Sequence, residues 1–320
     1  MQRLIDTILT QKEFIDNPPV LMDIGASGRI HEKWAPIAKY SKCIAFDADD
    51  RDFQFEKQEN SGFRELVMYN CIVSDQVSEE APFYLTKSPH CSSLLEPDLE
   101  SLKNWAYASL FEVERIAKLK TTDLPTVLKN LDVAQIDWFK TDSQGIDLRL
   151  FKSLGETVIS KVIAAEFEPG IINAYKGEDK LHSILAFMDA SDQFWLSDFI
   201  VKGSQKISEK RLNQIIPKKK TQKLLLATGK ISPGWGELTF LNNFKNPDLS
   251  RREVYLGWIF SSILNQHGFA SELALTGKEK FGEPLFDQLI RYSESKLKGQ
   301  LFNFKYVPLA YRKIKRMVTR

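Results

Sequence analysis

The stretch at residues 20–28, VLMDIGASG, decides the fold class of this 320-residue chain. Its first five residues are apolar apart from Asp23, and they predict a short buried strand. Gly25 and Gly28 then allow the backbone to turn tightly and to come close to a ligand, and the helix that follows offers free backbone amides. The stretch therefore predicts the first strand and the ligand-binding turn of an α/β domain.

Strand and helix patterns alternate along the rest of the first 245 residues. Apolar runs predict strands over residues 43–46, 65–73, 82–85, 136–140, 162–165, 194–201 and 237–241. Helical spacing predicts helices over residues 3–15, 124–131, 145–154 and 181–188. This alternation predicts a mostly parallel sheet with helices on both faces, in which ligands bind at the carboxyl ends of the strands.

The chain divides into two regions on the basis of these patterns. We expect a sheet domain over residues 1–245, opened by an N-terminal helix within residues 1–17 that Pro18 ends. Residues 246–320 are expected to form a helical extension with a basic tail, and its most apolar run, residues 254–264, is too short to span a membrane. A second basic stretch, residues 202–223, is typical of a solvated loop.

The composition argues against several classes of protein. The chain has 44 Lys and Arg against 42 Asp and Glu, a net charge of +2, so no global field draws it to nucleic acid. Its three cysteines form no CxxC pair, which argues against a disulfide framework and fits a reducing compartment. The N-terminus has no continuous apolar run, so we expect no secretory signal and a cytoplasmic protein.

An acidic residue near the glycine turn points to a cofactor. Asp47 comes 22 residues after Gly25, at the end of the next predicted strand, where a carboxylate can accept hydrogen bonds from both hydroxyls of a ribose. The turn lacks the first glycine of GxGxxG, which brings the backbone close to the pyrophosphate of a dinucleotide. A carboxylate at Asp23 suits an ammonium or sulfonium charge, so S-adenosylmethionine fits better than NAD.

Several motifs, in order, resemble the FkbM family of S-adenosylmethionine-dependent methyltransferases across roughly residues 18–245. They are residues 22–28 (MDIGASG), 45–49 (AFDAD), 69–75 (YNCIVSD), 92–94 (SSL), 138–148 (WFKTDSQGIDL) and 165–169 (AEFEP). The most specific is residues 138–148, which is similar to the Lys-x-Asp-x-(Glu/Gln)-Gly block of the family. The resemblance implies an α/β class I methyltransferase (Rossmann-like) fold with a seven-stranded sheet. It also implies O-methylation of a hydroxyl on a sugar, a polysaccharide or a natural product.

The glycine turn and the strand ends supply the expected cofactor residues. They are Asp23, Gly25, Ala26 and Gly28 around the methionine moiety, Asp47 and Ala48 at the ribose, and Cys71 and Ser74 near the adenine.

Methyl transfer to a hydroxyl also requires a group that takes a proton, which is general-base work. Asp142 and Glu166 follow adjacent predicted strands and are the main candidates. His90 is a third, because an ordinary imidazole pKa of about 6.5 suits proton transfer near neutral pH. Each also has a structural interpretation: Asp142 could cap the next helix, Glu166 could pair with Lys140, and His90 could be a solvated loop residue.

Other features leave alternatives open. Gln144 stands where many FkbM relatives have glutamate, and an amide is a poorer ligand for a hard cation, so we expect no obligatory metal. The aromatic residues Trp105, Tyr107 and Phe111 could line an acceptor pocket, although core packing is the favoured interpretation.

Two other functions also remain open from the sequence. They are an NAD-dependent enzyme on a related sheet, and a non-catalytic scaffold that binds a partner through residues 248–320. For a methyltransferase, the expected partner is a small-molecule or glycan acceptor. The basic tail could give weak contact with an anionic membrane surface, and the helical extension could form a homodimer contact.

Overall fold

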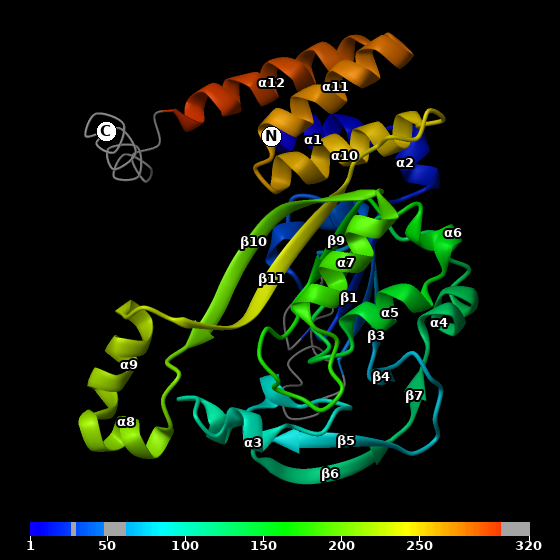
Figure 1. Cartoon of the computed structure of the whole chain (residues 1–320). Helices are drawn as coiled ribbons and strands as arrows, with labels where there is room; N and C mark the ends of the chain where they lie inside the picture. Colours follow the sequence, from blue (N-terminus) through cyan, green and yellow to red (C-terminus); the bar gives the residue numbers. More distant parts are fainter. Residues whose placement is uncertain (27–29, 48–61, 302–320) are drawn as a thin grey trace, which may run out of the picture. The chain divides into compact units, whose positions relative to one another are not determined.

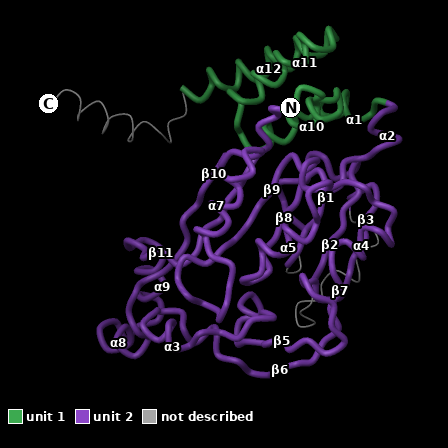
Figure 2. Tube along the Cα trace, turned by 45° about the vertical axis from the view of Figure 1, so that its right-hand side comes forward, with its two compact units in different colours: residues 1–11, 246–320 green, residues 12–245 purple. Residues whose placement is uncertain are grey.

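The computed structural model describes residues 1–26, 30–47 and 62–301 (Figure 1). Contacts divide the chain into two compact units, residues 12–245 and residues 1–11 together with the segment from residue 246 onward (Figure 2). The predicted opening helix is two helices, α1 (Gln2–Leu9) and α2 (Lys12–Asp16). The sequence analysis assigns both to the sheet domain, whereas the structure groups α1 with the C-terminal helices.

A seven-stranded sheet forms the centre of the larger unit. Its strands, from one edge to the other, are β3 (Glu65–Tyr69), β2 (Lys42–Phe46), β1 (Val20–Ile24), β8 (Trp138–Thr141), β9 (Ala164–Phe167), β11 (Ser232–Asn242) and β10 (Phe194–Ser204). All neighbouring pairs from β3 to β9 are parallel, and β11 runs antiparallel to both β9 and β10. This arrangement confirms the predicted α/β class with a mostly parallel sheet.

The strand register brings several loops to one edge of the sheet. Ile24 at the end of β1 is level with Phe46 at the end of β2 and with Thr141 at the end of β8. The residues that follow these strands therefore start from the same edge, which is where ligands bind in open α/β sheets.

Helices cover one face of the sheet and bury an apolar cluster against it. These helices are α4 (Leu124–Asn130), α5 (Asp147–Ser153), α6 (Glu156–Ile159) and α7 (Leu181–Ser191). Met22 and Phe139 belong to this cluster. The next residue along β8 toward its start, Trp138, points to the other face because side chains alternate along a strand. There its ring lies 6.0 Å from that of Trp34, in the 3₁₀ turn Glu32–Trp34.

Two small sheets and a short helix α3 (Leu99–Leu102) lie beyond the carboxyl ends of the strands. One small sheet pairs β4 (Ile72–Val73) with β7 (Thr121–Thr122) in parallel, and the other pairs β5 (Ala81–Thr86) with β6 (Val113–Leu119) antiparallel. The strand predicted over residues 65–73 is thus two strands, β3 and β4, and no pattern in the sequence predicts β6.

The last two strands of the sheet form a long ribbon. Strands β10 and β11 pair over their full length and continue past β9, which pairs only with residues 238–241 of β11 (Figure 1). Helices α8 (Glu209–Ile215) and α9 (Lys219–Thr228) connect the two strands. The prediction of a loop over residues 202–223 is therefore wrong for most of the stretch, because its basic residues 210, 211, 219, 220 and 223 lie on these helices and Lys202 lies in β10.

The smaller unit contains α10 (Arg251–Ile263), α11 (His267–Phe281) and α12 (Pro284–Gln300). Ser250 and Glu253 form a capping box at the start of α10, and the rings of Tyr255 and Phe286 stack at 4.7 Å. In the described part of the chain, no helix has both the length and the apolar character that crossing a bilayer requires. The basic tail beyond residue 301 lies outside the described residues.

Candidate functional site

A cavity, here called the strand-end cavity, lies over the carboxyl ends of β1, β2 and β8. It is lined by Ile24, Gly25, Phe46, Asp47, Cys71, Ile72, Val73, Phe83, Pro89, His90, Ser92, Leu94, Asp142, Ser143, Gln144 and Ile146. The structure therefore brings together Gly25, Asp47, Cys71, His90 and Asp142, which the sequence places in the site from widely separated segments.

Gly25 occupies a position that only glycine fits. Its φ of +78° lies in the left-handed region, and a Cβ there would lie 2.2 Å from the carbonyl oxygen of Asp142. The amides of Gly25 and Ala26 both donate to the Phe46 carbonyl oxygen, at 3.0 and 3.1 Å, and the Asp142 amide donates to Ile24 at 2.9 Å. The turn after β1 is thus fixed against the ends of β2 and β8.

Other predicted cofactor residues do not line this cavity. Ala26 is buried within the turn, and Ser74 is buried with its hydroxyl 3.3 Å from Asp75 Oδ1. Cys71, Ile72 and Val73 supply the wall where the sequence analysis expects Ser74. Gly28 and Ala48 lie outside the described residues.

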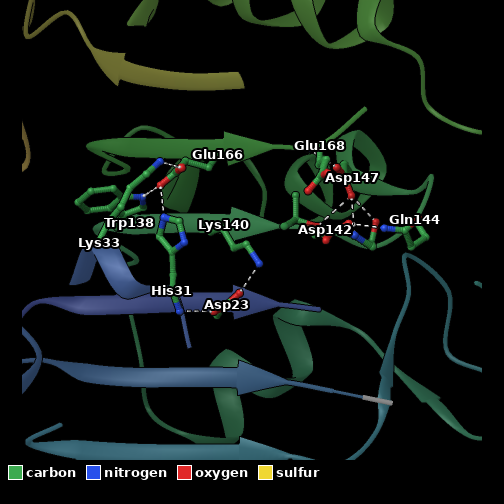
Figure 3. Close-up of polar contacts among 12 residues, drawn as sticks. Asp23, His31, Lys33, Trp138, Lys140, Asp142, Gln144, Asp147, Glu166 and Glu168 are labelled. Carbon is green, nitrogen blue, oxygen red and sulfur yellow. Dashed lines mark hydrogen bonds and ion pairs between the residues drawn. The ribbon is translucent and has the colours of Figure 1, made fainter. Parts of the chain in front are cut away.

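Asp23 holds a buried ion pair beneath the cavity instead of lining it. Its side chain is fully buried, with Oδ1 2.9 Å from Lys140 Nζ on the adjacent strand β8. Its other oxygen accepts the His31 amide at 3.1 Å, which fixes the segment after the glycine turn (Figure 3). Burial acts to lower the pKa of Lys140, but attraction to Asp23 and Asp142 outweighs it and raises that pKa, so the lysine stays charged.

Glu166 is held by a second polar cluster. Trp138 Nε1 donates to its Oε1 at 2.8 Å, His31 Nε2 lies 3.1 Å from the same oxygen, and Lys33 Nζ lies 2.6 Å from Oε2 (Figure 3). Burial acts to raise the pKa of Glu166, yet the contacts with His31 and Lys33 lower it to about 2. Lys140, the partner that the sequence analysis considers for Glu166, pairs with Asp23.

The position of Glu166 suits a structural role better than proton transfer. It lies within β9, outside the lining of the strand-end cavity, and its carboxylate is occupied by three donors from two other segments. A carboxylate with a pKa of about 2 is a weak proton acceptor at neutral pH.

A second cavity, of about 560 Å³, shares a wall with the first, and we name it the acceptor cavity for the role proposed for it below. His90, Asp142 and Gln144 line both cavities, and His90 is exposed. The remaining wall combines aromatic rings, carboxylates and glycines. These are Tyr107, Phe111, Tyr175 and Trp235, the carboxylates Glu168 and Glu178, and Gly145, Gly170, Gly203 and Gly234.

Two acidic residues, Asp142 and Glu168, share a hydrogen bond at the wall of the acceptor cavity. Burial raises the pKa of Asp142, although the charge of Lys140 and hydrogen bonds from Gln144 and Glu168 partly offset it. Burial and the neighbouring Asp142 raise the pKa of Glu168 to about 9. At neutral pH Glu168 therefore holds a proton and donates it in a hydrogen bond to Asp142, as expected where two carboxyl groups share a site.

Asp147 supports this arrangement from below. Its Oδ1 accepts from the Ser143 amide at 2.9 Å and from the Thr141 hydroxyl at 3.1 Å, and its Oδ2 accepts from the Glu168 amide at 2.9 Å (Figure 3). Burial raises the pKa of Asp147 to about 6. One side chain thus fixes the backbone after both β8 and β9, which sets the positions of Asp142 and Glu168.

Gln144 is held in a strained conformation between the two cavities. Its φ is +56°, a region that residues with a side chain rarely adopt. Its side-chain amide donates to Asp142 Oδ1, its Oε1 lies 2.9 Å from the Tyr175 hydroxyl, and its carbonyl accepts from the Ser93 hydroxyl at 2.7 Å. These contacts fix the orientation of the Asp142 carboxylate.

The sequence analysis overlooks several of these residues. Glu168 stands two residues after the predicted Glu166, and its place beyond the end of β9 is the signal that could have identified it. His31 and Lys33 contact Glu166 across more than 130 positions of sequence, which no local pattern reveals. Among the described residues, no group of three or more His, Cys, Asp or Glu side chains is placed to hold a metal ion.

Comparisons with protein-family models, with curated proteins and with solved structures each found no match for this chain.

Proposed function

We propose that this protein is an S-adenosylmethionine-dependent O-methyltransferase of the kind that its FkbM-like motifs imply. The observation that carries the proposal is the pair of adjoining cavities, which share Asp142 and Gln144 at the carboxyl ends of the strands. One cavity has the features of a nucleoside-binding site, and the other has room for an acceptor. A proton-sharing carboxyl pair lies where the reacting groups would meet.

The strand order also supports a class I methyltransferase fold. The strand that comes last in the chain, β11, is inserted antiparallel between β9 and β10. A dinucleotide-binding sheet of the Rossmann type has six strands and no such insertion. The class I methyltransferase sheet has this seven-stranded arrangement, so the topology favours S-adenosylmethionine over NAD.

The strand-end cavity has groups that fit the cofactor. Asp47 follows β2 and could accept hydrogen bonds from the ribose hydroxyls, while Cys71, Ile72 and Val73 offer an apolar wall for the adenine. Gly25 lines the same cavity, and the methionine portion would lie against its turn. When bound, S-adenosylmethionine supplies a methyl group on a sulfonium, which an acceptor oxygen can displace.

Asp142 is the general base in this proposal. The acceptor hydroxyl must give up a proton as its oxygen bonds to carbon, and Asp142 lies at the wall that the two cavities share. Burial raises the pKa of Asp142, while Lys140 and Gln144 favour its charged form, and the Gln144 side chain orients it. Glu168, and not Glu166, is the second carboxyl group of the proposed site. It is protonated and donates a hydrogen bond to Asp142.

The acceptor cavity suits a hydroxyl on a sugar, a polysaccharide or a natural product. Aromatic rings such as Trp235 and Tyr107 can pack on an apolar ring face, while Glu178 and the carboxyl pair can accept hydrogen bonds from hydroxyls. Three carboxyl groups in one cavity disfavour an anionic acceptor.

Calorimetric titration with S-adenosylhomocysteine tests the cofactor assignment. We expect micromolar binding to the wild-type protein and at least about tenfold weaker binding to Asp47→Asn, because two hydrogen bonds to an ionised acceptor are weakened. Asp132→Asn is the matched control, since Asp132 is exposed after α4 and lines neither cavity. Absence of binding by the wild-type protein would overturn the proposal.

A screen of acceptors with a labelled methyl donor then tests the reaction. We expect label on a hydroxyl-bearing acceptor and at least about a hundredfold slower labelling with Asp142→Asn, which keeps the shape of the side chain but removes the base. Cofactor binding that is retained by Asp142→Asn would separate the loss of proton transfer from a loss of the cofactor site.

A further inference from the structure

Strand β10 presents an unshielded edge on the larger unit. It is the terminal strand of the seven-stranded sheet, hydrogen-bonded only to β11 among the described strands. Four consecutive residues, Asp198 to Val201, are exposed, so neither face of the ribbon is covered there. Phe199, Ile200 and Val201 are 40%, 44% and 38% exposed. A long edge strand with apolar side chains is a template for pairing with another strand.

The exposed segment is regular between two irregularities. The pairing of β10 with β11 shifts register between Leu196 and Asp198 and again between Lys202 and Gly203. Residues 198–202 therefore form one regular extended segment, with the side chains of Asp198, Ile200 and Lys202 on one face and those of Phe199 and Val201 on the other.

This segment is complementary to itself. In an antiparallel pair with a two-fold axis at Ile200, Asp198 of one copy lies opposite Lys202 of the other, and this happens twice. Ile200 lies opposite Ile200 between the two ion pairs, and on the other face Phe199 lies opposite Val201. Opposite charges and apolar pairs directly across from each other are the contacts that stabilise antiparallel strands.

The existing contacts of the two charged residues allow this pairing. Asp198 has no ion-pair partner among the residues that the structure describes. Lys202 Nζ lies 2.9 Å from Glu237 on β11, and both side chains remain about two-fifths exposed. A second carboxylate could approach Lys202 from the open side of β10 without displacing Glu237.

We propose that β10 pairs antiparallel with β10 of a second copy of this chain, which forms a two-fold symmetric dimer with a continuous sheet across both larger units. The interface is isologous, as closed dimers require. Gly203 and Ser204 directly follow the paired segment and line the acceptor cavity, so dimer formation fixes one wall of that cavity in each copy.

Charge reversal tests the proposal by measuring molar mass in solution. We expect the wild-type chain to sediment as a dimer, and Asp198→Lys and Lys202→Asp each to raise the dimer dissociation constant by about tenfold or more, because each places like charges opposite at two positions. When the two variants are mixed, every such position again pairs a lysine with an aspartate. The mixture should therefore form heterodimers.

Two further variants guard against misfolding and general charge effects. Ile200→Lys places two lysines together on the axis and should also give monomers without touching either ion pair. Lys210→Asp, an exposed change on α8, should leave the dimer intact. A wild-type monomer at the highest attainable concentration would overturn the proposal, as would folded charge-reversal variants, verified by circular dichroism, that remain dimers.

Discussion

The carboxyl groups of Asp142 and Glu168 share one proton at the ends of two adjacent strands. Asp142 follows β8 and Glu168 follows β9. Burial and the charge of Asp142 raise the pKa of Glu168 to about 9, and Glu168 donates a hydrogen bond to Asp142. Glu168 therefore holds a proton at neutral pH, and its hydrogen bond favours the charged form of Asp142, the proposed proton acceptor. The charge state of the pair determines how the proposed methyl transfer should depend on pH.

Activity should show a bell-shaped pH profile. On the acid side Asp142 takes up a proton and can no longer act as a base. On the alkaline side Glu168 loses its proton near pH 9, which leaves two adjacent negative charges. Glu168→Gln keeps a hydrogen-bond donor to Asp142, so it should retain activity and lose the alkaline limb. Asp142→Asn should reduce the turnover rate by about 10²–10⁴-fold on the plateau of the profile and by less on the acid side, where Asp142 of the wild type is already protonated. An unchanged alkaline limb in Glu168→Gln would contradict the shared proton.

The same proton should affect stability. The pKa of Glu168 rises from an ordinary 4.5 to about 9 in the folded chain, so the folded state binds a proton that the unfolded state lacks between these values. The free energy of unfolding should therefore fall as the pH rises from about 5 to about 9. Urea titrations across this range should show a smaller decrease for Glu168→Gln than for the wild type.

The contribution of Glu166 to stability should depend on pH in the opposite direction. Its pKa falls from 4.5 to about 2 in the folded chain, so its stabilising effect is present above the ordinary value and is lost as the pH falls toward 2. The difference corresponds to about 3 kcal/mol at neutral pH. Glu166→Gln should be destabilised by this order at pH 7 and should approach the wild type at pH 2, as measured by denaturant unfolding. A large loss of turnover in a folded Glu166→Gln with normal stability would instead support a catalytic role.

Gly25→Ala should reduce stability more than the same substitution at an unobstructed glycine with a positive φ. The new Cβ would meet the Asp142 carbonyl oxygen at 2.2 Å, so the backbone after β1 or β8 must move. Gly155→Ala is the control, because Gly155 has a φ of +75° with no atom near its Cβ position. We expect Gly155→Ala to cost about 1–2 kcal/mol of stability and Gly25→Ala more than that. Gly25→Ala should also weaken binding of S-adenosylhomocysteine, which calorimetry would measure.

Substitution of Lys140 should change both the stability of the fold and the acid limb of the pH profile of activity. Lys140→Met leaves Asp23 buried without its ion-pair partner, and breaking a buried pair in this way costs about 3–5 kcal/mol. It also removes a positive charge that lowers the pKa of Asp142, so the acid limb of the pH profile should move to higher pH. The double variant Asp23→Asn, Lys140→Met should recover part of the stability and part of the shift, because the charge of Asp23 raises the pKa of Asp142. An acid limb that does not move in a folded Lys140→Met would contradict the role of Lys140.

The sequence predicts the sheet well and its polar clusters poorly. Apolar runs mark the strands, and glycine and acidic residues mark their ends, so Gly25, Asp47 and Asp142 can be placed near the site from local patterns. The pairing of β4 with β7 and the position of β6 depend on contacts between distant segments, which no local pattern encodes.

The choice between Glu166 and Glu168 shows the limit of sequence reasoning. The two residues lie in one short segment, and the predicted strand over residues 162–165 ends just before Glu166. In the structure β9 continues to Phe167, so Glu166 lies within the sheet against Trp138 and Glu168 lies beyond its end, at the acceptor cavity. A shift of two residues in the predicted end of this strand thus decides which glutamate is structural and which lies in the site.

Because Gly25 packs closely on Asp142, a backbone movement of one should be coupled to a movement of the other. The glycine turn cannot shift when a ligand enters or leaves the strand-end cavity unless the backbone of Asp142 shifts with it. We therefore expect an ordered kinetic sequence, in which the methyl donor binds first and aligns the base before the acceptor arrives. Departure of the spent donor would then reset the base for the next turnover.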